Sequence, residues 1–139
     1  MTKKTKATGL IAGLILTTAL GSGLALAGSE LRLETRIRGP RQAAGPMDGK
    51  VTFRNRLDEA RRQFSVEVER GRAGEMFDVM ISGVVVGTVM IDRSGIGELD
   101  YDDTADADDN DLPFPRNFPE LDGGEVVQVG PLTGTLQLK

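Results

Sequence analysis

Apolar and polar side chains alternate along several short segments of the chain. The segments "LRLETRIR" (31–38), "KVTFRNRL" (50–57) and "QFSVEVER" (63–70) place apolar residues at most second positions. Successive side chains of a β-strand point to opposite faces, so this period predicts three strands with one face in the core and one in water. In the second of them, the inward side chains would be Val51, Phe53 and Leu57.

The segment "FDVMISGVVVGTVMIDRSGIGELDY" (77–101) is the most regular part of the chain. Phe77, Val79 and Ile81 alternate with other residues up to Ser82-Gly83, a pair typical of a two-residue hairpin turn. We expect strands at 77–81, 84–91 and 98–101, arranged as a three-stranded meander.

The run 84–91 is almost continuously apolar and β-branched. This composition favours a central strand covered on both faces. Three methionines, Met76, Met80 and Met90, fall among these strand residues, and we expect them to fill the core rather than to bind a soft metal.

Two more strands are predicted near the C-terminus, in "GGEVVQVG" (123–130) and "LTGTLQLK" (132–139). The segment "LDEARR" (57–62) allows either one helical turn or a hairpin connection. About eight short strands with no convincing amphipathic helix predict an all-β fold, either an antiparallel sandwich or a partly closed barrel. The last strand has no polar tail, so its edge could also pair with another chain.

The N-terminal residues 1–27 have the pattern of a signal peptide. Lysines at positions 3, 4 and 6 precede the apolar stretch "LIAGLILTTALGSGLALA", which ends in Ala25-Leu26-Ala27. We expect cleavage before Gly28, export to the periplasm or the extracellular medium, and a single β-sandwich domain over 28–139. The alternative is an uncleaved membrane anchor, but the stretch is diluted by glycines and hydroxyl residues. No stable membrane insertion is expected after cleavage.

The charges are unevenly distributed along the chain. Residues 28–74 hold 11 Lys and Arg against 7 Asp and Glu, whereas residues 75–139 hold 3 against 14. This asymmetry fits either a dipolar surface that steers a charged partner or basic strands lying beside acidic ones in the sheets. The overall charge of the chain is −4, which makes nucleic acid a poor candidate partner.

Composition excludes several catalytic chemistries. The chain has no histidine and no cysteine, which excludes Ser-His-Asp and Cys-His nucleophiles and the usual zinc and copper sites. Beyond residue 27 the only lysines are Lys50 and Lys139, so a Ser-Lys pair has little support. A carboxylate pair acting on a glycosidic bond is the enzyme chemistry left open. We therefore do not expect an enzyme and predict no catalytic residue.

The segment "DDTADADDND" (102–111) is a candidate calcium loop because hard cations bind several closely spaced oxygens. It is not an EF-hand, since Ala107 stands where that loop needs glycine and Pro113 where it needs glutamate. A looser site remains open, and so do a solvated connection and a contact for a basic partner. The candidate calcium ligands are Asp102, Asp106, Asp108, Asn110 and Asp111.

Three prolines, at 113, 115 and 119, follow the acidic run and favour extended backbone. We expect them to stiffen a crossing from one sheet to the other. Phe114 and Phe118 lie between them, and we expect these rings to hold the loop against the core rather than to form an exposed contact.

Four segments resemble a known group of domains: "FSVEVE", "FDVMISGVVVGTVMIDRSGIGELDYD", "PFPRNFPEL" and "VVQVGPLTGTL". Together, over residues of about 62–139, they are similar to predicted secreted β-rich domains of planctomycete-type bacteria. That group has no established activity, so the resemblance implies an exported β domain and nothing about chemistry.

These observations favour an exported, non-catalytic β-sandwich with a structural, adhesive or surface-assembly role, with calcium possible at the acidic loop. The alternative is a secreted or periplasmic binding module that recognises a charged protein or polymer. A carboxylate-dependent enzyme is a distant third.

Overall fold

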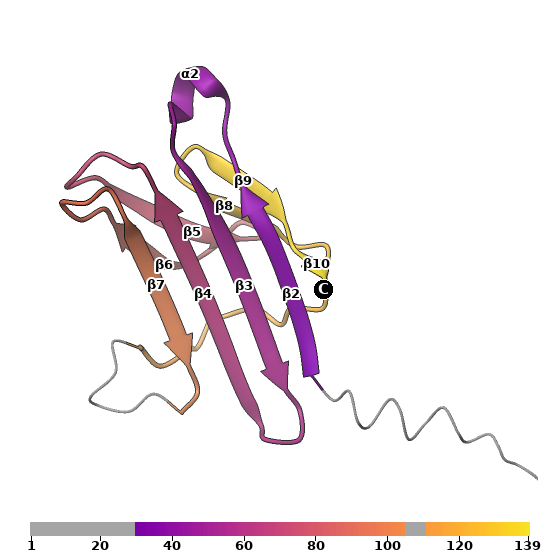
Figure 1. The fold of residues 1–139 in the computed structure, drawn as a ribbon. Coiled ribbons are helices and arrows are strands. Elements are labelled where there is room, and N and C mark those ends of the chain that lie inside the picture. The colour runs from indigo at the N-terminus through magenta and orange to yellow at the C-terminus, as the bar shows by residue number, and fades with distance from the viewer. Residues whose placement is uncertain (1–29, 105–110) are drawn as a thin grey trace, which may run out of the picture.

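The protein is built of two antiparallel β-sheets stacked face to face (Figure 1). The computed structural model describes residues 30–104 and 111–139. In these residues the first sheet has five strands in the order β10-β2-β3-β4-β7, and the second has four in the order β6-β5-β8-β9. The predicted sandwich is confirmed, and the sheets do not close into a barrel. The strands are β2 (Glu30–Ile37), β3 (Asp48–Arg56), β4 (Arg61–Glu69), β5 (Met76–Ile81), β6 (Val84–Met90), β7 (Gly97–Asp102), β8 (Val126–Val129), β9 (Leu132–Thr135) and β10 (Gln137–Leu138).

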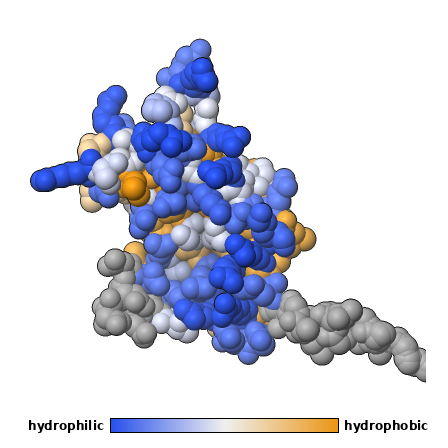
Figure 2. All heavy atoms as spheres, in the orientation of Figure 1, coloured by the Kyte–Doolittle hydropathy of each residue, from blue (hydrophilic) through white to orange (hydrophobic). Residues whose placement is uncertain are grey.

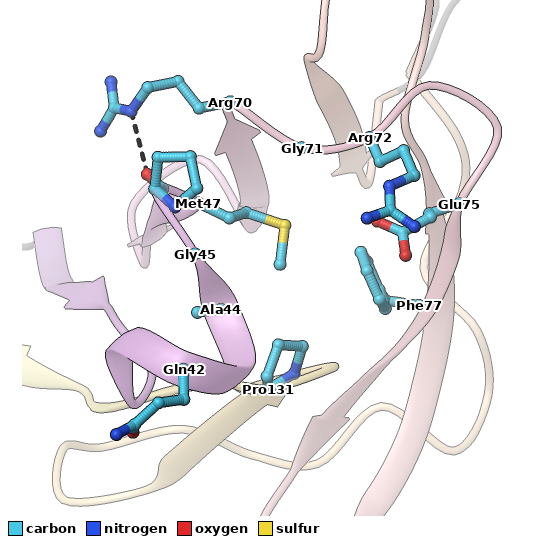
Figure 3. Close-up of a pocket in the computed structure, with 11 residues that line it drawn as sticks. Gln42, Ala44, Gly45, Met47, Arg70, Gly71, Arg72, Glu75, Phe77 and Pro131 are labelled. Carbon is cyan, nitrogen blue, oxygen red and sulfur yellow. Dashed lines mark hydrogen bonds between the residues drawn. The ribbon is translucent and has the colours of Figure 1, made fainter.

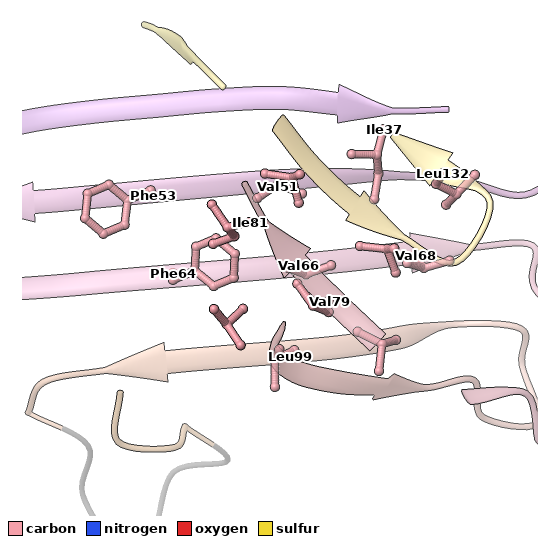
Figure 4. Close-up of a cluster of buried hydrophobic side chains, with 14 of the residues drawn as sticks. Ile37, Val51, Phe53, Phe64, Val66, Val68, Val79, Ile81, Leu99 and Leu132 are labelled. Atoms are coloured by element: carbon pink, nitrogen blue, oxygen red, sulfur yellow. The ribbon is translucent and has the colours of Figure 1, made fainter. Parts of the chain in front are cut away.

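The core lies between the sheets and consists mainly of the side chains that alternate inward (Figure 4). In the five-stranded sheet, Val51, Val66 and Leu99 lie side by side on adjacent strands. Val79 and Ile81 face them from the other sheet. Burial of each such side chain contributes about 1.5–3 kcal/mol to the stability of the fold. The fold depends on this burial because the chain has no disulfides.

The hairpin prediction for β5 and β6 is confirmed. Ser82 and Gly83 connect the two strands, and both have positive φ, 49° and 84°, as a type I′ turn requires. Residues 57–62 likewise form a hairpin connection, because Arg56 pairs with Arg61. Within the described residues a helical turn, α2 (Arg41–Ala44), lies between β2 and β3. Leu57, predicted to point inward, is 65% exposed at the hairpin end.

The predicted three-stranded meander is wrong, since β7 pairs with β4 and not with β6. The turn after β6 carries the chain across to the other sheet. It closes with a hydrogen bond from the backbone N–H of Asp92 to the carbonyl of Ile96 (2.8 Å). The Asp92 carboxylate accepts from the Ser94 hydroxyl at 2.6 Å and from the backbone N–H groups of Ile96 and Ser94. These bonds, the one from the Ser94 hydroxyl first, lower the Asp92 pKa.

The predicted position of 84–91 as a central strand is also wrong, because β6 is an edge strand with one face in water. Val86 and Val89 are buried, whereas Val85 and Met90 are exposed. The pairing with β5 shifts register between Val79 and Met80, which places an extra residue on β6. A continuous apolar run therefore does not mean burial on both faces here.

The segment 132–139, predicted as one strand, forms two strands that belong to different sheets. β9 pairs with β8, and β10 pairs with β2. The chain changes sheets at Leu136, which is fully buried and exchanges hydrogen bonds with Gly124 and Glu125. Residues 30–104 and 111–139 thus contain nine strands rather than the eight predicted, because this segment divides.

In the described part of the chain, no helix has the length and apolar character needed to cross a membrane. The predicted signal peptide, residues 1–27, lies outside the described residues.

Candidate functional site

The predicted calcium ligands are only partly placed by the structure. Asp106, Asp108 and Asn110 lie outside the described residues, while Asp102 and Asp111 are described. Asp102 is 3% exposed and already has protein partners. Its carboxylate accepts from Arg61 Nη2 at 2.7 Å and Nε at 3.2 Å, and from the Thr104 backbone N–H at 2.9 Å. The hydrogen bonds from Arg61 hold the Asp102 pKa well below its usual range.

A second arginine pair lies next to the first. The Asp103 carboxylate accepts from Arg62 Nε at 2.8 Å and Nη2 at 2.9 Å, which lowers the Asp103 pKa. The Arg62 guanidinium lies 4.2 Å from the centre of the Phe114 ring. Phe114 packs in turn on Phe118, with ring centres 4.8 Å apart, and Phe118 is buried. The prediction that both rings hold this loop against the core is confirmed.

These contacts fix the start and the end of the acidic segment on the sandwich. Leu112 bridges β7 through two backbone hydrogen bonds, with Asp100 and Asp102. Within residues 30–104 and 111–139, no group of three or more acidic side chains is arranged to hold a metal ion. In the described residues Asp102 pairs with Arg61, and calcium binding by the segment, with Asp102 among the candidate ligands, stays a prediction.

The outer face of the five-stranded sheet is densely charged, and Figure 2 shows this side as a largely hydrophilic surface. We call it the charged face. Its ion pairs include Lys50 with Glu34 at 3.2 Å and Arg54 with Glu30 at 3.1 Å. Basic side chains dominate on β3, β2 holds two arginines and two glutamates, and Glu98 and Asp100 lie on β7 at the far edge.

The outer face of the four-stranded sheet has the opposite character. Its strands β5, β6, β8 and β9 contain one charged residue, Asp78. Of the eight large apolar side chains exposed in the described residues, five lie on this sheet. We call this surface the low-charge face. It comprises Met76, Asp78, Met80, Val85, Thr88, Met90, Val126, Gln128, Thr133 and Thr135.

The prediction that the methionines fill the core is wrong for Met76 and Met90. They are cross-strand partners on the low-charge face and are 62% and 60% exposed, while Met80 is half-buried. The outward position of these methionines could have been predicted from the sequence. Side chains alternate along a strand, so if Phe77 and Val79 point inward, their neighbours must point outward.

The free edge beside this face is partly blocked. The Tyr101 hydroxyl donates to the Val86 carbonyl at 2.6 Å, and Asn117 Nδ2 donates to the Val85 carbonyl at 3.1 Å. Together with the register shift, these donors leave β6 a poor template for strand addition. The face of this sheet is therefore a better candidate contact surface than its edge.

No known protein family and no curated protein matches the chain. The resemblance to secreted planctomycete-type domains thus stays a prediction.

Proposed function

We propose that the protein is an exported, non-catalytic β-sandwich with a surface-assembly role, in which the low-charge face packs against the same face of a second copy. The observation that carries this proposal is the clustering of exposed apolar side chains on a sheet face with a single charge, Asp78. Contiguous apolar patches rimmed by polar residues commonly mark contact surfaces. Export rests on the signal-peptide pattern of residues 1–27, and the non-catalytic assignment on the lack of histidine and cysteine.

Charge favours a second copy as the partner. Contact between two charged faces would remove water from many ionised side chains. The free-energy cost of this desolvation exceeds the gain from ion pairs across the contact unless their geometry is excellent. Two low-charge faces bring together only one carboxylate from each copy. In such an isologous contact the same patch of both copies forms the interface, so no other protein is needed.

The size of the face indicates a weak contact. Four strands about 4.8 Å apart, with roughly five residues each rising about 3.3 Å, cover about 320 Å² in projection. A stable interface buries about 800 Å² per partner. Contacts below that size are typical of weak, reversible association, so we expect copies of the protein to pair at high concentration.

Sedimentation velocity of the purified protein over a series of concentrations tests this proposal. We expect reversible self-association that persists in high salt, because apolar contacts are not screened. Val85→Lys and Met90→Lys place a charge in the contact and should leave the protein monomeric. Leu138→Lys is a matched control, since Leu138 is 70% exposed on the other sheet. A wild-type protein that stays monomeric throughout, or a control that dissociates equally, would contradict the proposal.

A further inference from the structure

A cavity of about 580 Å³ opens at one end of the sandwich (Figure 3). The α2 loop, the loop 70–75 and the turn at Pro131 enclose it. Met76 of the low-charge face is the chain neighbour of two lining residues, Glu75 and Phe77, but does not itself line the cavity. The volume of the cavity falls within the usual range for small-ligand sites. Loops carried at one end of a rigid sandwich are a common place for binding sites.

The walls of the cavity are held in place by contacts between its loops. Arg70 donates through Nε to the Pro46 carbonyl at 3.0 Å and through Nη2 to Asp48 at 2.6 Å. The Gly71 backbone N–H donates to the carbonyl of Gly95 at 2.9 Å. Arg70 adopts a left-handed backbone, with φ of 59°, which is a strained conformation for a residue other than glycine. The cavity is therefore preformed rather than a gap between loose loops.

The floor of the cavity is apolar. Ala44 and Met47 are 8% and 7% exposed, and Pro131 and the half-buried Phe77 complete it. A β-carbon on Gly130 would lie 2.4 Å from the Phe77 ring, so only glycine lets this turn pack against that ring. An apolar group of a ligand would be well accommodated here.

The mouth of the cavity holds one cation and one anion with no partner in the described structure. Arg70 is paired with Asp48, but no hydrogen bond or ion pair engages the side chain of Arg72 or that of Glu75. The two residues are joined by a hydrogen bond from the Glu75 backbone N–H to the Arg72 carbonyl at 3.1 Å. Figure 3 shows both side chains beside Phe77.

We propose that this cavity binds an α-carboxylate that is flanked by an apolar side chain, as found in the C-terminal residue of a peptide or in a free apolar amino acid. The Arg72 guanidinium pairs with the carboxylate, since arginine matches its two oxygens. Glu75 accepts from the nitrogen of the same residue, and the side chain lies on Met47 and Phe77. The site is independent of the assembly proposed above.

Titration of the purified protein by NMR with acetyl-Ala-Ala-Phe tests the proposal. We expect saturable shifts at Gln42, Arg72, Glu75 and Phe77. The C-terminal amide of the same peptide lacks the charge, and acetyl-Ala-Ala-Gly lacks the apolar side chain. Each should bind at least about tenfold more weakly, equivalent to about 1.4 kcal/mol. Titration with free phenylalanine shows whether the nitrogen must belong to an amide, and saturation at the same residues by either compound supports the site.

Arg72→Glu reverses the charge at the mouth and should weaken carboxylate binding at least about tenfold. Arg93→Glu is the matched control, because Arg93 is an exposed arginine of a neighbouring loop that does not line the cavity. Both variants should keep the melting temperature of the wild type. Equal affinity for acid and amide, an unaffected Arg72→Glu variant, or shifts of neither ligand at these residues would overturn the proposal.

Discussion

Arg61 of β4 and Asp102 of β7 form a two-point ion pair across neighbouring strands, with Nη2–Oδ2 and Nε–Oδ1 distances of 2.7 and 3.2 Å. These residues are 41 positions apart in the chain, and their pair joins its basic and acidic parts. Asp103 and Arg62 repeat the arrangement one residue further on. Basic and acidic strands thus do lie side by side here, although most of the other ion pairs are formed within residues 30–74.

Asp102→Asn should destabilise the fold. The amide keeps the shape of the carboxylate but loses its charge, so the donors of Arg61 and Gln63 lose their charged acceptor. We expect a loss of about 1–3 kcal/mol in the free energy of unfolding, measured by urea denaturation. Asp58→Asn, at an exposed hairpin residue, should change it by less than about 0.5 kcal/mol. Equal effects of the two variants would show that the Arg61 pair adds nothing.

The low pKa of Asp102 predicts a loss of stability in acid. Its folded pKa lies below the unfolded value of about 3.9, so the unfolded state binds the proton more readily. The contribution of Asp102 is present above pH of about 4 and fades as the pH falls toward the folded pKa. Urea denaturation across this range should show the wild-type and Asp102→Asn curves converging in acid. A difference that stays constant with pH would rule out Asp102 as the titrating group.

Gly87 and Tyr101 should be energetically coupled. A β-carbon on Gly87 would lie 2.4 Å from the Tyr101 hydroxyl and 2.8 Å from Leu99. Gly87→Ala should therefore cost about 1–3 kcal/mol by overpacking. Tyr101→Phe should cost about 1–2 kcal/mol, because the buried Val86 carbonyl loses its donor.

The double variant separates this contact from general strain. Tyr101→Phe removes the oxygen nearest to the added methyl group, so Gly87→Ala should be milder in that background by about 1 kcal/mol. The free energies of unfolding of the four proteins give this coupling directly. Simple additivity would mean that the hydroxyl and residue 87 do not interact.

Calcium binding by the acidic segment is tested by thermal unfolding with calcium, magnesium or EDTA. A site of about 1 mM affinity would add about 1.4 kcal/mol at about 10 mM calcium. Calcium binding predicts a calcium-specific rise in melting temperature that Asp106→Asn and Asp108→Asn abolish, whereas a solvated connection predicts no such rise. An equal small shift with magnesium would identify the segment as a solvated connection.

The alternation of side chains was sufficient to predict most strands and the inward residues, because strand geometry is local. It did not determine which sheet each strand joins. Leu99 and Tyr101 point into the same core whether β7 pairs with β6 or with β4. The alternation of apolar and polar residues therefore cannot show that the chain crosses to the other sheet after Asp92. The change of sheet at Leu136 could not be predicted either, because the side chains of "TGTLQL" alternate without interruption.

The candidate sites were less predictable for the same reason. The low-charge face was implicit in the alternation, but its significance depends on β6 being an edge strand, which follows from long-range pairing. The loop-end cavity brings together residues from three separate segments, including Met47, Arg72 and Pro131. No local pattern joins these positions.

We propose the low-charge face as the contact between copies of the protein. Two-dimensional amide NMR spectra of an isotope-labelled sample, recorded over a dilution series, locate this contact. We predict that the concentration-dependent shifts map to β5, β6 and β8, around Met76, Val85, Met90 and Val126. Shifts confined to the charged face, or spectra that do not change with concentration, would contradict a contact through the low-charge face.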